Sequence, residues 1–441
     1  LAELPTPEIE ERPEKVAVVG SGPAGLAVAY YLRLKGYQIT IFEALPVLGG
    51  MLRVGIPDYR LPPEILDGEI NNILRLGIET QTGKRLGFDF TLEDLRTEGY
   101  QAVFLGIGAH RSLKMGIRGE EEFEGVVDAV DFLREVNLGE RARPGKRVVV
   151  IGGGNVAIDA ARAAVRLGCE QVSIVYRRSR EEMPAYPEEI EGALSEGVEI
   201  HYLTAPLGIV GTNGKVSGFE CIQTELGPPD ESGRRRPVPV EGSEFVIDCD
   251  AVIPAIGQQP EVDWAVDEDG LEITRRNTLV VDPHTMQTAV PGVFSAGDSV
   301  SGPATVIEAV ASGHKAVEAI HRYINGEDLT LYAEEVEARE PPGQEWREIP
   351  EDFLVEARAQ LPHRDPQESK SHFDEVALGF EEEEARREAN RCINCGICCE
   401  CMECVRACER NAVDHNMVEE EVEVKVGSII MATGFQTLDP A

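Results

Sequence analysis

Residues 15–44 read KVAVVGSGPAGLAVAYYLRLKGYQITIFEA, and they carry the strongest fold signal in the chain. A β-branched run comes first, apolar residues at helical spacing follow, and a second apolar run completes the stretch. Gly20, Gly22 and Gly25 occupy the turn between the first run and the helical segment. A β-α-β unit with Gly-x-Gly-x-x-Gly at its turn predicts a Rossmann-like domain that binds a dinucleotide.

The glycines and one carboxylate of this unit have separate physical roles. Gly20 permits the tight turn, Gly22 lets backbone N–H groups approach a pyrophosphate, and Gly25 lets helix and strand pack closely. The helix N-terminus adds partial positive charge for the phosphates. Glu43 ends the second strand, where a carboxylate can bind a ribose 2′-hydroxyl.

A distant loop at 292–317 favours FAD over NAD for this domain. It reads GVFSAGDSVSGPATVIEAVASGHKAV, so Gly297 and Asp298 close a strand and an apolar helix follows from about Thr305. FAD is long enough to need a second loop facing its phosphates or ribityl chain, and NAD would not reach it. The pairing of the two loops therefore predicts FAD. The alternative is an ordinary strand–turn–helix.

A second copy of the unit, KRVVVIGGGNVAIDAARAAVRLG, begins at residue 146 and leads into the strand QVSIVY. Gly152, Gly154 and Ala157 repeat the glycine spacing, and the third position tolerates alanine. The chain is therefore expected to hold two dinucleotide-binding domains.

Arginines follow the second strand of this copy. Arg177 and Arg178 come first and Arg180 stands close by, with no acidic residue placed to bind a ribose hydroxyl. Arginine at this point suits a 2′-phosphate, which favours NADPH. The alternative is that the arginines are ordinary surface residues and that NADH binds.

Seven of the ten cysteines crowd into RCINCGICCECMECVRAC at 391–408. From Cys398 onward the spacing C-x2-C-x2-C-x3-C is that of bacterial [4Fe–4S] sites. Two clusters take eight thiolates, so the segment predicts one cluster with spare thiols, or two clusters with one other ligand. Zinc, the competing metal, prefers cysteine pairs separated by a dozen or more residues. The expected ligands are Cys392, Cys395, Cys398, Cys399, Cys401, Cys404 and Cys408.

The formal net charge of −37 argues against nucleic acid and anionic membranes as partners, because both require basic patches. The charge serves solubility or docking to a basic partner subunit. No apolar run reaches the ~18 residues of a membrane span, so no membrane insertion is expected. Dense thiols without a secretion signal favour a reducing, cytoplasmic location. Cys169, Cys221 and Cys249 stand in apolar contexts and are expected to be reduced core residues.

Proteins that use NAD(P)H and FAD to reduce disulfides carry a Cys-x4-Cys pair near the flavin. The equivalent stretch here, LGGMLRVGIPDYRLP at 48–62, contains no cysteine, so a dithiol relay is not expected. The sequence contains no Ser-His-Asp signature, which would have indicated a hydrolase. No catalytic side chain is predicted, because the cofactors themselves supply hydride chemistry.

Residues 15–325 resemble the small subunit of NADPH-dependent glutamate synthase. They also resemble the flavin domains of dihydropyrimidine dehydrogenase and the large subunit of NADH-dependent ferredoxin:NADP oxidoreductase. The resemblance rests on the two glycine turns, on LGGMLRVGIPDYRLP, YRRSREEMPA and AIGQQP, and on FSAGD with PATVIEAVASG. It implies FAD in an outer domain and NAD(P)H in a domain inserted into it.

The order of the segments departs from those relatives, which usually carry iron–sulfur cysteines before the flavin domain. Here the cysteines come after it, and VGSIIMATGFQTLDP at 426–440 resembles the start of a flavin domain of the heterodisulfide reductase A type. We therefore expect the cysteine segment to connect the FAD- and NAD(P)H-binding domains to a further redox domain.

The α/β chain is expected to contain two Rossmann-like domains and a small C-terminal iron–sulfur segment. The expected boundaries are an N-terminal strap at 1–14, an FAD-binding domain at 15–112 and 257–327, an NAD(P)H-binding domain at 113–256, a linker at 328–388, an iron–sulfur segment at 389–415, and a closing strand or further domain at 416–441.

Both sets of nucleotide contacts follow from the turns and the resemblance together. The residues expected to bind FAD are Gly20, Gly22, Pro23, Ala24, Gly25, Glu43, Ala44, Gly50, Met51, Leu52, Ile56, Gly106, Gly108, Gly297, Asp298, Ala304, Thr305 and Val306. Those expected to bind NAD(P)H are Gly152, Gly153, Gly154, Asn155, Val156, Asp159, Arg177, Arg178 and Gly257.

The leading hypothesis is an oxidoreductase subunit that passes electrons between NAD(P)H, FAD and [4Fe–4S], and on to another redox subunit or a ferredoxin-like carrier. Electron bifurcation between two acceptors is a variant of it. The alternatives are an electron donor of the glutamate synthase small-subunit type, and a scaffold subunit that keeps its nucleotide folds without turnover. The two intact glycine turns count against the scaffold.

Overall fold

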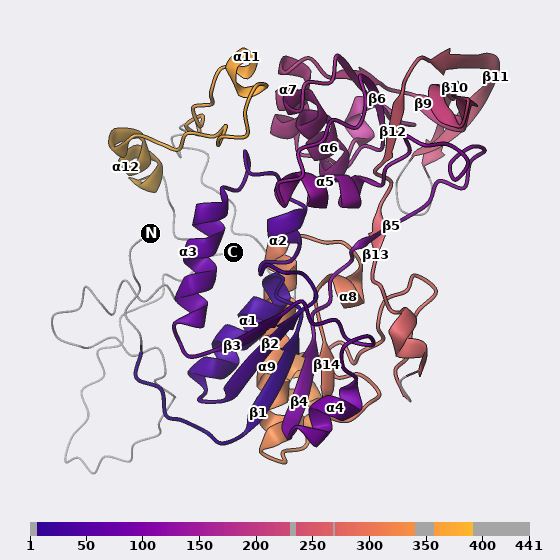
Figure 1. Ribbon diagram of the computed structural model, residues 1–441. Coiled ribbons are helices and arrows are strands. Elements are labelled where there is room, and N and C mark those ends of the chain that lie inside the picture. The colour runs from indigo at the N-terminus through magenta and orange to yellow at the C-terminus, as the bar shows by residue number, and fades with distance from the viewer. Residues whose placement is uncertain (1–6, 230–234, 268–269, 340–356, 391–441) are drawn as a thin grey trace, which may run out of the picture. The chain divides into compact units, whose positions relative to one another are not determined.

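The computed structural model describes residues 7–229, 235–267, 270–339 and 357–390 (Figure 1). These residues fall into two units. The larger contains the described residues up to 339 together with 360–379, and the smaller contains 357–359 and 380–390. The seven expected cysteine ligands and the tail at 426–440 lie outside the described residues.

The outer half of the larger unit is built on a five-stranded parallel sheet of order β14-β4-β1-β2-β3. Its strands are β1 (Lys15–Val19), β2 (Gln38–Glu43), β3 (Glu79–Thr82), β4 (Tyr100–Leu105) and β14 (Val293–Ser295). Alternate residues of β1 join different cores, since Val16 and Val18 pack on one face and Ala17 and Val19 on the other. A strand buried on both faces reads as a continuous apolar run, as this one does.

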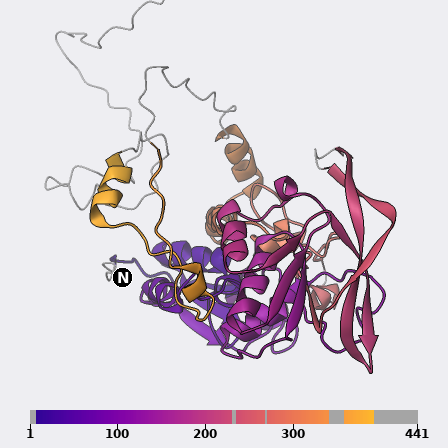
Figure 2. The same cartoon turned by 90° about the horizontal axis from the view of Figure 1, so that it is seen from above.

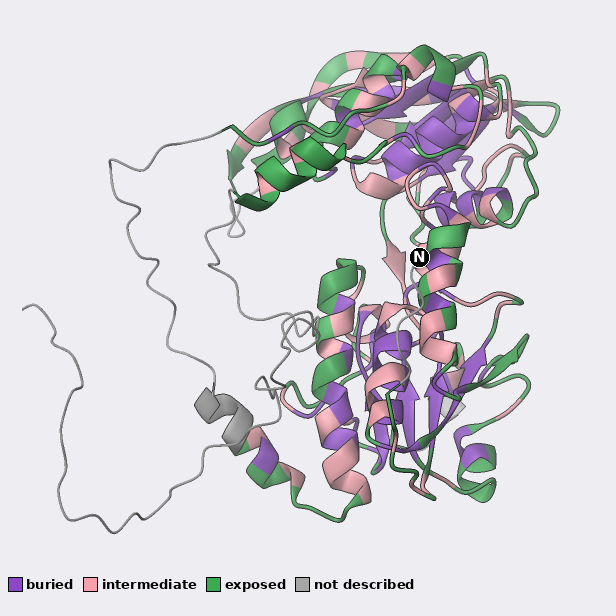
Figure 3. Cartoon of the chain, turned by 90° about the vertical axis from the view of Figure 1, so that its left-hand side faces the viewer, coloured by how far each residue is buried: buried purple, intermediate pink, exposed green. Residues whose placement is uncertain are grey.

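Helices cover both faces of this sheet (Figure 3). Helices α1 (Pro23–Leu34) and α9 (Val306–Ile324) share the first core, and α4 (Leu92–Thr97) contributes to the second. The other described elements of the outer half are α2 (Met51–Val54), α3 (Pro63–Leu74), α8 (Asp298–Ser301), the 3-10 turn η2 (Asp263–Asp267) and α10 (Leu329–Arg339). Among the described helices, none combines the length and apolar composition needed to traverse a bilayer.

The inserted half is built on a four-stranded parallel sheet of order β12-β6-β7-β8. Its strands are β6 (Arg147–Ile151), β7 (Gln171–Val175), β8 (Glu199–His201) and β12 (Ala251–Pro254), and its helices are α5 (Ala129–Asn137), α6 (Asn155–Arg166), the 3-10 turn η1 (Arg180–Glu182) and α7 (Pro187–Ser195). Both predicted β-α-β units are present, so the predicted fold class is confirmed. Strand β4 pairs with β1 in the sheet of the outer half, and β12 pairs with β6 in the sheet of the inserted half.

The inserted half has an additional sheet, and a pair of short strands connects it to the outer half. An antiparallel sheet of β9 (Thr204–Thr212), β10 (Lys215–Pro229) and β11 (Arg235–Ile247) extends from it and had no counterpart in the sequence prediction (Figure 2). The short strands β5 (Arg111–Ser112) and β13 (Gln258–Gln259) pair antiparallel and carry the chain between the two halves (Figure 1).

The stretch expected to be a linker contains two short helices besides α10. Helix α11 (Pro366–Ser369) belongs to the larger unit, where segment 360–379 packs against the inserted half. Helix α12 (Glu382–Asn390) belongs to the smaller unit, in which the Ala359 N–H donates to Glu388 Oε1 at 2.8 Å.

Candidate functional site

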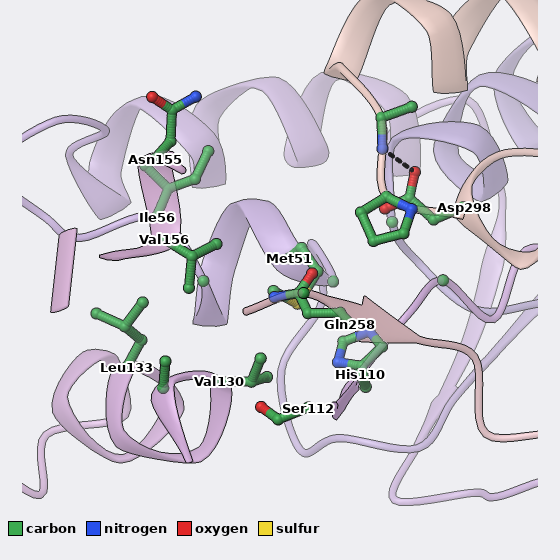
Figure 4. A pocket seen from close by; sticks show the side chains of 18 of the residues that line it. Met51, Ile56, His110, Ser112, Val130, Leu133, Asn155, Val156, Gln258 and Asp298 are labelled. Carbon is green, nitrogen blue, oxygen red and sulfur yellow. Dashed lines mark hydrogen bonds between the residues drawn. The ribbon is translucent and has the colours of Figure 1, made fainter. Parts of the chain in front are cut away.

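A cavity of about 1300 Å³ is lined by residues from both halves (Figure 4). Sites for a single small molecule usually measure about 300–1,000 Å³, so this one has room for more than one ligand. The walls include the glycine turns of both β-α-β units, and both turns therefore open into the same space.

The first glycine turn is shaped by close backbone contacts. A Cβ on Gly20 would lie 2.3 Å from the Gly106 carbonyl oxygen, and a Cβ on Gly25 would lie 2.0 Å from the Gly20 carbonyl oxygen. Gly22, in contrast, has nothing within 4 Å of its Cβ position and lines the cavity. The turn thus presents bare backbone to the space where a ligand would lie.

Helix α1 begins at this turn without any side-chain cap. Gly22 is its N-cap residue, Pro23 is its first residue, and no acidic residue stands in its first turn. Its first N–H groups and the positive end of its dipole therefore remain available to an anion. This set of donors fits the pyrophosphate of a dinucleotide.

Glu43 is buried beside the turn and is held by several donors. Its Oε2 accepts hydrogen bonds from the Ser21 N–H at 2.9 Å and from Ser21 Oγ at 2.5 Å, and its Oε1 accepts one from the Leu45 N–H at 2.8 Å. Ser21 Oγ also accepts the Gly49 N–H at 3.0 Å. Ser21 was missed by sequence reasoning, and its place inside the glycine motif was the available signal.

The distant loop at 292–317 reaches the same cavity. Gly297 adopts φ +73°, and Asp298 Oδ1 accepts the Ala304 N–H at 3.3 Å (Figure 4). Burial raises the pKa of Asp298 to about 6, although the Ala304 N–H opposes the rise. Helix α9 then starts with a complete capping box, in which Thr305 and Glu308 satisfy each other's backbone N–H groups. Unlike α1, this helix start is already capped by its own side chains.

The second glycine turn repeats the geometry of the first. Gly152 has φ +144°, and a Cβ there would lie 2.2 Å from the Ala255 carbonyl oxygen, whereas Gly154 has nothing within 4 Å. Helix α6 begins after Gly154 with no side-chain cap and no acidic residue in its first turn. The cavity thus contains two open helix N-termini, one from each half.

The arginines after β7 divide into two groups. Arg177 and Arg178 line the cavity, and Arg178 Nε donates to the Arg235 carbonyl at 2.8 Å. Arg180 is paired with Glu191 and is not part of the lining. Two cations therefore stand near the second turn where a 2′-phosphate would be expected.

Asp159, on α6, is a buried carboxylate in the wall of the cavity. Its Oδ2 lies 2.7 Å from Arg60 Nη1, and its Oδ1 is buried with no hydrogen-bond partner among the described residues. Burial raises the pKa of Asp159 to about 7, and Arg60 limits the rise. The free oxygen is an acceptor that a bound nucleotide could satisfy.

Two polar residues of the cavity follow strands β4 and β12 and were missed by sequence reasoning. His110 precedes β5 and Gln258 lies in β13, and both point toward Met51 (Figure 4). Burial, with the nearby Arg134, lowers the pKa of His110 to about 4, so its ring is neutral at pH 7. Gln258 Nε2 is buried without an acceptor among the described residues. Their position directly after GIGA and AIG was the signal.

The structure gathers nearly all of the predicted nucleotide contacts. Every residue expected to bind FAD or NAD(P)H lines the cavity except Gly25, which packs behind the turn against the Gly20 carbonyl. Cys221 and Cys249 are buried free thiols whose pKa burial raises to about 12, and Cys169 is a partly exposed free thiol. Among the described residues, no group of three or more His, Cys, Asp or Glu could hold a metal.

Two Rossmann units that open into one shared cavity define a class of oxidoreductases that bind two dinucleotides. The chain belongs to the pyridine nucleotide-disulphide oxidoreductase family, whose model matches residues 14–313. The resemblance stated from the sequence is thereby confirmed, since the glutamate synthase [NADPH] small chain of Escherichia coli K12 is 38% identical over 72% of this chain and 70% of that one.

A longer relative shares more of the chain. The beta subunit of the NADP(+)-dependent formate dehydrogenase of Moorella thermoacetica is 45% identical over 393 residues, which cover 87% of this chain and 54% of that protein. The chain thus spans about half the length of this curated relative. Among solved structures, Mycobacterium tuberculosis FprA in complex with NADPH superposes with a TM-score of 0.61 at 20% identity, over 74% of this chain and 89% of that one, which shows a shared fold.

Proposed function

We propose that this chain is an electron-transfer subunit that takes electrons from NADPH onto FAD and hands them, through iron–sulfur centres, to a partner redox subunit. The observation that carries the proposal is the single cavity into which two uncapped helix N-termini open. The NADP(+) and NADPH in the names of the relatives support NADP(H) as one nucleotide, and family membership supports FAD as the other. Their names, as a beta subunit and a small chain, support work in a complex.

The proposed role of the residues that line the cavity is to bind the two nucleotides and to orient them. The α1 turn and Glu43 would hold FAD in the outer half, and the α6 turn with Arg177 and Arg178 would hold NADPH in the inserted half. When bound, FAD supplies the conversion between two-electron hydride transfer and one-electron transfer. The neutral ring of His110 adds no charge to the space where the two ligands would meet.

The iron–sulfur part of the proposal rests on the sequence of the cysteine segment. One or two [4Fe–4S] clusters on Cys392–Cys408 would give electrons a route out of the flavin. Thiolates at this density favour a reducing compartment such as the cytosol. Analysis of iron and acid-labile sulfide per chain distinguishes one cluster from two.

An anaerobic titration of the purified protein tests the proposal. NADPH is expected to bleach the flavin absorbance and then the broad iron–sulfur absorbance, and NADH is expected to do so at higher concentration. A flavin that stays oxidised with both nucleotides, or a purified chain that lacks flavin, would overturn the proposal and favour a scaffold subunit.

A further inference from the structure

The outer half contributes a five-residue loop, Ile56–Arg60, that is held by the inserted half, and we call it the anchor loop. At its first residue, the Ile56 carbonyl accepts a hydrogen bond of 3.1 Å from Asn137 Nδ2 at the end of α5. Further on, the Asp58 carboxylate lies 3.0 Å from Arg141 Nη2. The loop therefore contacts the inserted half at both of these points.

Arg60 connects the halves through two ion pairs. Its Nη1 lies 2.7 Å from Asp159 Oδ2 on α6, and its Nε lies 3.0 Å from Glu189 Oε1 on α7. The side chain of Asp159 is 5% exposed, and those of Arg60 and Glu189 are each 20% exposed. A two-point contact this poorly solvated fixes direction as well as distance.

Tyr59 lies fully buried next to Arg60. The guanidinium of Arg166 stands 3.8 Å from the centre of its ring and that of Arg162 stands 4.8 Å away, both from α6. Glu196 holds the two arginines in place, at 2.7 Å from Arg162 and 2.6 Å from Arg166. The Tyr59 ring of the outer half thus makes cation–π contacts with two arginines of the inserted half, and Glu196 holds both arginines in place.

Segment 360–379 closes the anchor loop from outside. The Val376 N–H donates to the Tyr59 carbonyl at 3.0 Å, and the Phe373 ring lies 6.2 Å from the Tyr59 ring, centre to centre. Arg141 in turn stands 4.3 Å from the centre of the Phe373 ring. The loop is consequently enclosed on two sides.

The anchor loop matters because it adds to the narrow ribbon and to the contacts between α2 and α5 that also join the halves. Strands β5 and β13 have two residues each, and relative motion of domains is the ordinary expectation unless an interface prevents it. Ile56, Arg60 and Asp159 all line the nucleotide cavity, so movement at the loop would move the walls of the site. Hydride transfer requires reacting atoms about 3–3.5 Å apart, and an error of 1 Å can cost about 100-fold in rate.

We propose that the anchor loop is a positioning element, with Arg60 as its main residue, that locks the inserted half in the one orientation in which the two nucleotide sites face each other. The stretch that holds a dithiol in disulfide-reducing proteins here holds two domains together instead. The inference rests on the proposed function for its kinetic meaning, but the lock itself is a structural claim that can be tested separately.

The kinetic test compares Arg60→Gln with Arg53→Gln in the full chain with its cofactors. Arg53 belongs to the same stretch but pairs with Asp67 inside the outer half, and it does not line the cavity. Rapid anaerobic mixing with NADPH gives a limiting rate of flavin reduction and an apparent Kd. For Arg60→Gln we expect a limiting rate lower by about tenfold or more, with a Kd within about threefold of wild type. Arg53→Gln should match wild type in both.

A milder variant and a second measurement distinguish failure of the lock from failure of the proposed function. Arg60→Lys keeps the charge but loses the two-point contact, so an intermediate rate is expected if Arg60→Gln does not fold. A wild-type limiting rate in both Arg60 variants would overturn the lock. If wild type itself is not reduced by NADPH or NADH, the proposed function fails, and hydrogen exchange of the amides at 58–61 decides the lock. Exchange should be faster in the Arg60 variants, and unchanged exchange would contradict it.

Discussion

At the residue scale, the glycines of the two turns are of two kinds: at some a Cβ would clash with a backbone carbonyl, and at others it would enter open space in the cavity. The Gly-x-Gly-x-x-Gly spacing was enough to predict the turn, the helix start and the carboxylate at Glu43, because these are local consequences of backbone geometry. Asp159 and Arg60 also lie in the site, but their pairing joins residues 99 apart in sequence, which no local pattern reveals.

Alanine at two of the glycines should separate folding from binding. In Gly25→Ala the new Cβ meets the Gly20 carbonyl at 2.0 Å, so we expect a loss of about 1–3 kcal/mol in stability from overpacking. In Gly22→Ala the Cβ enters open space at the cavity, so the melting temperature without ligand should be unchanged while the flavin content falls. Thermal melts and flavin-to-protein ratios check both, and equal melting temperatures for the two variants would contradict this account.

Nucleotide preference should reside in Arg177 and Arg178. Replacing both with alanine removes charge-assisted hydrogen bonds worth about 1.5–3 kcal/mol each, so NADPH should bind at least about tenfold more weakly while NADH binding is unchanged. Arg180→Ala is the matched control, since Arg180 pairs with Glu191 outside the lining. Equal losses for NADPH and NADH would show that the arginines do not read the 2′-phosphate.

Asp159 should make stability depend on pH. Its pKa is about 7 in the folded protein against 3.8 for the unfolded chain, with Arg60, Glu189 and Arg162 as the charges that face it. Between these values the folded state holds a proton that the unfolded state releases, so the free energy of unfolding falls as pH rises. Melting temperatures of wild type relative to Asp159→Asn should therefore decrease from about pH 5 to about pH 8. If the melting temperatures of wild type and Asp159→Asn change with pH in parallel, the Asp159 carboxylate is already ionised at pH 5, which contradicts the prediction.

At the element scale, the two β-α-β units were predictable because strand and helix periodicities switch within about thirty residues. The antiparallel β9–β11 sheet was not, since β10 mixes Gly and Pro into its run and its partners are fixed by long-range pairing. The anchor loop belongs to a stretch whose sequence resembles the family, but its role depends on contacts with α5, α6 and α7 that only the folded chain supplies.

Two helix caps allow a matched comparison. Thr305 and Thr91 each form a capping box, on α9 and α4, and only Thr305 lines the cavity. Thr305→Ala and Thr91→Ala should each lose about 1 kcal/mol of stability. Denaturant unfolding measures that loss, and flavin affinity should weaken only in Thr305→Ala. A matching effect of Thr91→Ala on flavin affinity would contradict the assignment of the α9 loop to the site.

At the scale of the whole molecule, the nucleotide cavity, the anchor loop and the cysteine segment fit the proposed role, in which the chain accepts electrons from a soluble nucleotide and passes them to a partner. The chain spans 54% of the formate dehydrogenase beta subunit of Moorella thermoacetica. Under the proposed function, a partner subunit would carry out the terminal reaction. The net charge of −37 serves solubility or docking to a basic partner subunit, and docking of that kind would weaken as salt screens the charges.

The most direct test of the central claim follows flavin and iron–sulfur absorbance together after rapid anaerobic mixing of the full chain with NADPH. The account predicts that the flavin bleaches first and that the clusters are reduced afterwards at a rate that depends on the flavin. Clusters that are reduced while the flavin stays oxidised, or no reduction of either with NADPH, would contradict it.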